Sequence, residues 1–286
     1  MGLIRRRIYK KMSGKLYVVG TPIGNLGDMS PRAVETLSKV DFIAAEDTRV
    51  TVKLLNHFGI KKEMLAYYEH NKNAKGNLII ERMLKGESCA VVSDAGMPAI
   101  SDPGEDLVRS AREAGIEIES VPGPSALITA ISISGFPCGR FCFEGFLSMN
   151  KISRRQHLES LKTEKRTMVF YEAPHKLPAT LKDMLSYFGE RKIVLIRELT
   201  KIHETVAHWS LSEAAKYYEE NAAKGEFVLI VEGAREEKEE YTLEMAVALA
   251  RKFVAEGSST SAAAKEAAEI TGIKKGDIYK EILKEE

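Results

Sequence analysis

The stretch VVSDAGMPAISDPG, residues 91–104, decides how the first half of this sequence folds and what it can bind. Its first residues continue a run of small apolar side chains, which is typical of a strand buried on both faces of a sheet. The run ends at Ser93 and Asp94, and two glycines and two prolines follow before residue 105. Prolines fix the backbone before a ligand arrives, and glycines let a ligand approach it closely. The stretch therefore predicts a strand and then a stiff loop that presents backbone amides and a carboxylate.

Two further loops rich in glycine and proline follow apolar runs in the same half of the chain, at 20–30 and 122–126. Short apolar runs alternate there with stretches of helical spacing, which predicts a parallel sheet with helices on both faces. The predicted strands are 16–20, 42–46, 89–94 and 116–121, and the predicted helices are about 31–39, 48–58, 105–114 and 124–134. Ligands of such sheets bind beyond the carboxyl ends of the strands, so the three loops are expected to share one edge and form a binding site.

The second half of the chain has a mixed pattern of strands and helices. Two of its strands, 191–199 and 204–210, are too close in sequence for a helical crossover, so we expect them to pair antiparallel. The other predicted strands are 141–146, 167–173 and 226–233, with helices at about 151–163, 175–188 and 211–223. The fold class is therefore α/β, with two α/β domains and a small helical appendage.

The appendage begins after the charged run at 234–240, which has the composition of a linker. From residue 241 the sequence favours helix throughout, and Gly257 and Gly272 divide it into three short helices. The predicted organisation is a basic tail at 1–14, a cofactor-binding domain at 15–135, a second domain at 136–233, the linker, and a helical domain at 241–286.

Composition narrows the class of protein. The net charge is +1, so an anionic partner has to be held by a local patch. The three cysteines and the absence of a signal peptide are typical of reduced thiols in the cytoplasm. Cys138 and Cys142 are four residues apart, but no second His/Cys pair completes a metal site, so no metal is expected. No apolar run reaches the roughly 20 residues that span a bilayer, and no membrane association is expected.

The loops also exclude some ligands. Gly20, Gly24 and Gly27 have a spacing that does not match the dinucleotide fingerprint, and no Lys-Ser/Thr pair follows a glycine-rich loop as in a P-loop. Glu46 and Asp47 stand where a ribose-binding acid would, so a nicotinamide ligand is disfavoured but not excluded. The spacing itself indicates a nucleoside-like or adenosyl ligand.

Seven segments together resemble a known family. They are VGTPIGNLGDMSPRA, AAEDTR, SDAGMPAISDPG, VPGPSA, FYEAPHK, RELTKIHE and GEFVLIVEG. This combination resembles the tetrapyrrole methylase superfamily and, within it, the branch of small-subunit (16S) rRNA 2′-O-ribose methyltransferases. The resemblance extends from about Lys15 to the C-terminus and does not cover the basic tail. It implies S-adenosylmethionine bound in a cleft between two α/β domains, S-adenosylhomocysteine as product, and methyl transfer to the ribose 2′-oxygen of a cytidine.

The resemblance also implies which positions contact the cofactor. They are Pro22, Asp94, Met97, Ser125, Ala126, Tyr171 and Gly225. A carboxylate at the end of a strand, as at Asp94, is suited to bind a ribose hydroxyl or an ammonium group.

Methyl transfer to an alcohol requires positioning and a group that handles the hydroxyl proton. The segments FYEAPHK and RELTKIHE concentrate ionisable side chains next to predicted strands, although a charged turn can equally be a solvated hairpin tip. The first candidates for the base are Glu172 and His203, and Lys201 or Arg197 is expected to hold phosphate. His175, Glu198 and Glu204 lie in the same two segments.

A basic surface for RNA is expected on residues 151–166, which contain six Lys/Arg and two Glu. Arg154, Arg155 and Lys162 are the candidate phosphate contacts, although the same pattern also occurs on helices that are only solvated. Residues 241–286 hold eight acids and seven bases, so charge does not indicate an RNA-binding role for them.

Two alternatives stay open. One is a methyltransferase that acts on carbon in a porphyrin or corrinoid precursor, and the other is a non-catalytic module that binds an adenosyl group or RNA. The basic segment at 151–166 fits a polyanion better than a small macrocycle, and the ionisable residues of RELTKIHE favour an enzyme. By analogy with the superfamily, a homodimer is expected, with 16S rRNA as partner, free or within the small ribosomal subunit.

Overall fold

The structure is a computed structural model, and it describes residues 14–235 and 241–284. Nearly all of the predicted basic tail and most of the predicted linker lie outside these residues. The chain divides into two compact units, residues 1–234 and 235–286, which are described separately.

The first unit begins with a sheet of five parallel strands in the order β3-β2-β4-β1-β5. Its strands are β1 (Lys15–Val19), β2 (Phe42–Ala45), β3 (Glu63–Ala66), β4 (Cys89–Val92) and β5 (Glu117–Val121). Every residue of β2 and β4 is buried, because helices cover both faces of the sheet. The parallel sheet predicted from the sequence is confirmed.

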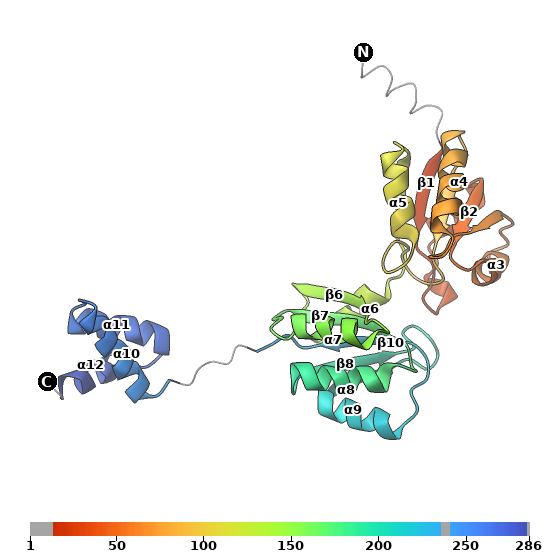
Figure 1. The fold of residues 1–286 in the computed structure, drawn as a ribbon. Helices are drawn as coiled ribbons and strands as arrows, with labels where there is room; N and C mark the ends of the chain where they lie inside the picture. The colour runs from red at the N-terminus through yellow and green to blue at the C-terminus, as the bar shows by residue number, and fades with distance from the viewer. Residues whose placement is uncertain (1–13, 236–240, 285–286) are drawn as a thin grey trace, which may run out of the picture. The chain divides into compact units, whose positions relative to one another are not determined.

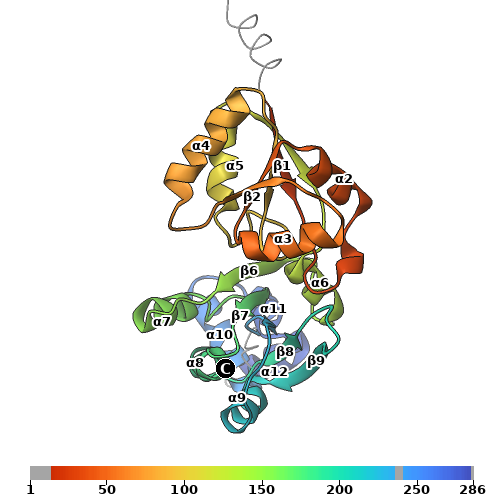
Figure 2. The same cartoon turned by 90° about the vertical axis from the view of Figure 1, so that its right-hand side faces the viewer.

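The helices divide between the two faces according to the alternation of side chains along the strands. Ile43 and Ala45 pack with α2 (Pro31–Lys39) and α3 (Thr48–His57), whereas Phe42 and Ala44 face α4 (Lys72–Leu84) and α5 (Gly104–Glu113). Figure 2 shows α4 and α5 on one side of the sheet and α2 on the other. A short 3₁₀ helix, η1 (Leu26–Asp28), lies in the loop after β1.

Strand β3 and helix α4 were not predicted from the sequence. The four residues of β3 are exposed or half-buried, so they form no continuous apolar run. Helix α4 has no side-chain hydrogen bond at its N-cap and contains Gly76. Its N-terminal capping signal and its helix propensity are therefore both weak.

The second sheet has the order β6-β7-β10-β8-β9. Its strands are β6 (Phe141–Phe146), β7 (Thr167–Glu172), β8 (Lys192–Arg197), β9 (Thr205–Ser210) and β10 (Phe227–Val231). Strands β6 and β7 are parallel, and the other neighbours are antiparallel. The antiparallel pairing predicted for β8 and β9 is confirmed, with register from Lys192–Ser210 to Arg197–Thr205.

One face of this sheet packs against α7 (Lys151–Ser160), α8 (Leu177–Phe188) and α9 (Leu211–Glu220). Figure 1 shows α8 and α9 below the strands. The opposite face packs against α6 (Ala126–Ile133) and against Ile23 from the loop after β1. Helix α6 therefore follows the last strand of the first sheet but is buried on the second, which joins the two sheets.

The second unit contains three helices, α10 (Leu243–Ala255), α11 (Thr260–Thr271) and α12 (Lys275–Leu283). Its core consists mainly of alanine and isoleucine and is separate from the cores of the first unit. Gly272 ends α11 in the left-handed conformation (φ 71°), as predicted for this position. None of the helices in the described parts of the chain has the length and apolar character needed to cross a bilayer.

Candidate active site

The three glycine- and proline-rich loops meet at one edge of the first sheet, as predicted. Thr21 and Gly96 exchange backbone hydrogen bonds of 2.9 and 3.1 Å between the loops after β1 and β4. Gly20 lies against the loop after β5, where a Cβ on Gly20 would come within 2.7 Å of the Gly123 Cα. These close approaches require glycine and fix the three loops to one another.

The loop after β4 is held in shape by one of its own side chains. Asp102 Oδ1 accepts hydrogen bonds from the amides of Ala99 (2.9 Å) and Gly104 (2.8 Å). Ala99 and Ser101 have positive φ angles of 68° and 66°, which are unfavourable for residues other than glycine. The carboxylate of Asp102 therefore stabilises a strained loop next to the site.

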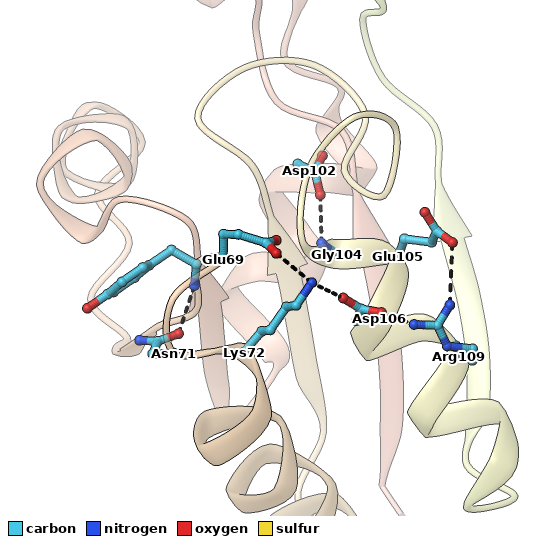
Figure 3. A network of polar contacts seen from close by, with 9 residues as sticks. Glu69, Asn71, Lys72, Asp102, Gly104, Glu105, Asp106 and Arg109 are labelled. Atoms are coloured by element: carbon cyan, nitrogen blue, oxygen red, sulfur yellow. Dashed lines mark hydrogen bonds and ion pairs between the residues drawn. The ribbon is translucent and has the colours of Figure 1, made fainter. Parts of the chain in front are cut away.

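Ion pairs around Lys72 hold helix α5, which directly follows this loop (Figure 3). The Lys72 ammonium lies 2.7 Å from a carboxylate oxygen of both Glu69 and Asp106. Asp106 also pairs with Arg109. The first turn of α5 is thus linked to the start of α4.

The loops and the second sheet enclose a cavity of about 550 Å³. Its walls come from the loops after β1, β4 and β5, from the ends of β6 and β7, and from β8 and β10. This volume is in the range of ligand-binding sites, roughly 300–1,000 Å³.

The residues that line this cavity include five carboxylates and no Lys, Arg or His. The five are Glu46, Asp94, Asp102, Glu172 and Glu226. Burial raises the pKa of both Glu46 and Asp94. Backbone amides oppose this effect, because Asp94 N donates to Glu46 (3.4 Å) and Asp47 N donates to Asp94 Oδ1 (3.0 Å). The cavity is therefore suited to a ligand with a positive charge.

Most of the residues predicted to bind a cofactor line the cavity. They are Asp94, Met97, Ser125, Ala126 and Tyr171. Pro22 and Gly225 are not among the lining residues but are next to Ile23 and Glu226, which are.

Tyr171 and Ser125 also have structural contacts. The Tyr171 hydroxyl accepts a hydrogen bond from Leu127 N (2.9 Å), and Ser125 Oγ accepts one from Ile128 N (3.5 Å). Both bonds cap the first turn of α6, so the second sheet and this helix are held together beside the cavity.

Glu172 is the predicted catalytic residue that lines the cavity. It is buried, and its two carboxylate oxygens accept hydrogen bonds from Ala173 N (2.8 Å) and Thr180 Oγ1 (2.6 Å). Each oxygen keeps a further lone pair, so the carboxylate can still accept a proton or another hydrogen bond.

The other three predicted catalytic residues lie in or beside the loop after β8 and are not among the lining residues. The Lys201 ammonium lies 2.9 Å from both Glu198 and Glu226. Burial lowers the pKa of Lys201, but its ion pairs with Glu226 and Glu198 outweigh burial and raise the pKa overall. Arg197 Nε donates to Lys224 O (2.7 Å), and His203 is exposed.

Gly225 is required by the packing of this loop. Its φ angle is 84°, and a Cβ would come within 2.6 Å of the Glu198 side chain. Glu198 Oε1 accepts a hydrogen bond from Glu226 N (2.9 Å), and Glu198 itself has a positive φ of 53°. The segment GEF thus positions Glu226 at the cavity and Glu198 beside Lys201.

Two of the predicted RNA contacts, Arg154 and Arg155, lie in α7, and the third, Lys162, follows it, but the three side chains are not equally exposed. Arg154 pairs with Asp183 at 2.5 Å, and its side chain is only 12% exposed. Arg155 and Lys162 are exposed.

Glu46 and Glu226 line the cavity but were not among the predicted cofactor or catalytic residues, although Glu46 stands where a ribose-binding acid would. Glu226 directly follows the predicted Gly225, and Glu46 directly follows β2. These positions next to predicted features are the signal that the sequence offers for the two residues. The missing information was that β2 lies beside β4, which brings Glu46 next to Asp94. Among the described residues, no three potential metal ligands lie together.

Comparisons with known proteins agree with this architecture. The profile of the family described as Tetrapyrrole (Corrin/Porphyrin) Methylases matches residues 15–215. A protein from Synechocystis sp. named "Ribosomal RNA small subunit methyltransferase I" is 47% identical over 268 residues, which are 93% of this chain and 96% of that protein. A protein of the same name from Thermotoga maritima is 47% identical over 220 residues, which are 77% of this chain and 99% of that protein.

The fold is also found in solved structures. Uroporphyrin-III C-methyltransferase from Thermus thermophilus, crystallised with S-adenosylhomocysteine, has a TM-score of 0.54 and 16% identity over 77% of this chain and 97% of its own. At this identity the match concerns the fold alone. The family profile and the close relatives show that the chain belongs to the tetrapyrrole (corrin/porphyrin) methylase family of methyltransferases.

Proposed function

We propose that the protein transfers the methyl group of S-adenosylmethionine to the ribose 2′-oxygen of a cytidine in small-subunit (16S) ribosomal RNA. The observation that carries this proposal is the identity of 46–49% over at least 93% of the chain with several proteins named ribosomal RNA small subunit methyltransferase I. That similarity includes most of the C-terminal unit, which a general methylase fold does not explain.

The cavity fits S-adenosylmethionine as cofactor. The residues that would hold it are the predicted ones that line the cavity, Asp94, Met97, Ser125, Ala126 and Tyr171. Pro22 and Gly225 would act by fixing the backbone next to the lining residues Ile23 and Glu226. The lining carries carboxylates without basic residues, which favours a sulfonium and ammonium ligand over the diphosphate of a dinucleotide. When bound, S-adenosylmethionine supplies an electrophilic methyl group. No metal takes part in the proposal.

The same lining argues against the main alternative. Porphyrin and corrinoid precursors carry several carboxylates, and the lining of the cavity offers no Lys, Arg or His to bind them. A ribose and its base are uncharged, and RNA phosphates can stay outside the cavity. The acidic lining therefore supports RNA as the substrate over an acidic macrocycle.

We propose that Glu172 accepts the proton of the 2′-hydroxyl, because the residue lines the cavity and its carboxylate, held by Ala173 N and Thr180 Oγ1, keeps free acceptor capacity. Lys201 is proposed to contact phosphate, since its ion pairs keep it protonated and therefore unsuited to act as a base. Arg197 is the second proposed phosphate contact. His203 stays a candidate base. Its ring is exposed and does not line the cavity, so it could act only if RNA binding moved the loop after β8 towards the cavity.

The RNA surface is proposed to extend over α7 and the residues directly after it. Arg155 and Lys162 are the proposed phosphate contacts, whereas Arg154 is held by Asp183 and is proposed to contact RNA only if that ion pair opens. The protein is proposed to act in the cytoplasm as a homodimer on 16S rRNA, free or within the small ribosomal subunit.

The test is to incubate the protein with labelled S-adenosylmethionine and small ribosomal subunits that lack the modification. We expect label in 16S rRNA, at a single cytidine ribose located by mass spectrometry of nuclease fragments. Label in a porphyrinogen instead would show the alternative substrate. Binding of S-adenosylhomocysteine without transfer to either substrate would show a non-catalytic module.

A further inference from the structure

Phe146 lines the active-site cavity although the residue is 54% exposed to solvent. Its ring contacts the ring of Tyr171 at a centroid distance of 5.5 Å and an angle of 60°. Tyr171 is itself held by Leu127 N and by an edge contact from Phe143. The Phe146 ring is therefore fixed on one side by an ordered aromatic pair, while much of its surface stays open to solvent.

A β-bulge in β6 places Phe146 at the cavity. Phe143 pairs with Val169, but Phe146 pairs with Tyr171, so β6 has one residue more than β7 in this interval. In a regular strand, side chains three residues apart point to opposite faces. The bulge at Gly145, whose φ is 63°, brings Phe146 onto the face that carries Phe143 and Tyr171.

The residues that follow Phe146 join this apolar rim to a basic helix. Met149 and Ile152 are 71% and 69% exposed, and α7 begins at Lys151 with Arg155 exposed one turn later. The cavity is acidic, whereas α7 is basic. A ligand that fits both regions has a planar uncharged group at Phe146 and an anionic chain along α7.

We propose that Phe146 is the platform on which the base of the target nucleotide stacks after it leaves the RNA stack; this inference rests on the proposed function. The ribose 2′-oxygen can enter the cavity only if its nucleotide turns out of neighbouring stacked bases. Aromatic side chains bind such bases through their faces. The phosphates on either side then lie outside the acidic cavity, towards α7.

The experiment measures methyl transfer to unmodified small ribosomal subunits by the full-length protein and its variants. Phe146→Ala is expected to raise KM for the subunit roughly 10- to 100-fold, the loss expected when one stacked base is no longer supported. KM for S-adenosylmethionine and the affinity for S-adenosylhomocysteine in calorimetry should not change. Phe146→Tyr and Phe146→Trp should restore KM, whereas Phe146→Leu, which keeps apolar volume without an aromatic face, should not.

Ile152→Ala is the matched control, because Ile152 is exposed in the same stretch but does not line the cavity. An unchanged KM in Phe146→Ala, normal activity in Phe146→Leu, or an equal effect in Ile152→Ala would overturn the stacking role. A change of oligomeric state in Phe146→Ala on a sizing column would assign the residue to a subunit interface and overturn it as well. Failure of the wild-type protein itself to label 16S rRNA would instead refute the proposed function, and the stacking role with it.

Discussion

At the scale of single residues, the site depends on one carboxylate that stabilises a strained loop. Asp102 Oδ1 accepts two backbone amides within the loop that also contains the positive φ angles of Ala99 and Ser101. Asp102→Ala removes both acceptors and is expected to lower the free energy of unfolding by about 1–2 kcal/mol. The loop should then lose its shape, and the affinity for S-adenosylhomocysteine should fall at least as much.

Asp102→Asn is the control for this change, because its amide oxygen can still accept both hydrogen bonds. We expect it to keep most of the stability and most of the affinity, as measured by urea unfolding and calorimetry. Equal losses in both variants would show that the negative charge of Asp102 matters more than the loop geometry.

The acidic lining of the cavity reduces stability in the ligand-free protein. Burial raises the pKa of Glu46, so the folded state binds a proton more tightly than the unfolded state. The loss of stability caused by burying Glu46 is therefore largest when the pH is above the pKa of Glu46 in the folded protein. It disappears as the pH falls below the ordinary value of 4.5. Glu46→Gln should raise the free energy of unfolding at pH 8 by on the order of 0.5 kcal/mol, since water still reaches the carboxyl.

Urea unfolding at pH 8 and at pH 4 checks this prediction. The gain from Glu46→Gln should be present at pH 8 and absent at pH 4. Glu35 is a control of opposite sign, because its ion pair with Lys39 lowers its pKa. Glu35→Gln should reduce stability slightly at pH 8, and a gain there would contradict the electrostatic explanation.

The residues predicted through the family resemblance lie in motifs that are local in the sequence. Asp94 and Met97 follow a strand in a loop with glycine and proline, a pattern that is visible without a structure. The contact of Glu46 with Asp94 was not predicted, because it depends on two strands being neighbours, and the sequence does not specify their order. The support that Asp102 gives to its own loop depends on backbone angles that composition does not reveal.

At the scale of elements, the basic segment formed by α7 and the residues after it contains one arginine in a mostly buried ion pair, Arg154, and two exposed basic residues, Arg155 and Lys162. Arg155→Glu with Lys162→Glu reverses two charges and is expected to raise KM for the ribosomal subunit about tenfold at low salt, with a smaller effect at high salt. Both side chains are exposed, so the unfolding midpoint in urea and the affinity for S-adenosylhomocysteine should stay unchanged.

Arg154→Ala is expected to behave differently. It leaves Asp183 without its ion pair in a partly buried position, so the unfolding midpoint should fall. Normal stability in Arg154→Ala would contradict the structural role of Arg154. An unchanged KM in the Arg155→Glu, Lys162→Glu variant would contradict the RNA-binding role of these two residues.

The elements predicted correctly have either a clear pattern of apolar residues or clear signals at their ends, such as an N-cap residue. β4 is a fully buried apolar run, and α2 begins with Ser30 as N-cap followed by proline. β3 lacks a continuous apolar run because its residues are exposed or half-buried. α4 lacks a side chain that caps its N-terminus. The bulge at Gly145 was also not visible, because a bulge is defined by its pairing with β7.

At the scale of the whole molecule, packing assigns α6 to the second sheet although it follows β5 in sequence. Sequence order gave no reason to expect this, since helices in alternating α/β patterns usually cover the sheet they follow. The consequence is functional, because Ser125, Ala126 and Tyr171 then come from segments packed on each other beside one cavity.

The C-terminal unit has a hydrophobic core of its own, so it can be removed without opening the cores of the α/β unit. The relative from Thermotoga maritima aligns with 77% of this chain over 99% of its own length, so a protein of that name is about as long as the α/β unit alone. Methyl transfer is therefore expected not to need residues 235–286. A chain that ends at Ala234 should bind S-adenosylhomocysteine with unchanged affinity and keep its kcat.

The truncated chain should lose affinity for RNA only. The C-terminal unit has nearly balanced charge, so its contribution to RNA binding should depend on shape and a few contacts, and its loss should change the salt dependence of KM little. Steady-state kinetics with unmodified small ribosomal subunits at two salt concentrations measures this. We expect a higher KM with unchanged kcat, and loss of cofactor binding together with activity would show that the α/β unit depends on the C-terminal unit for its fold.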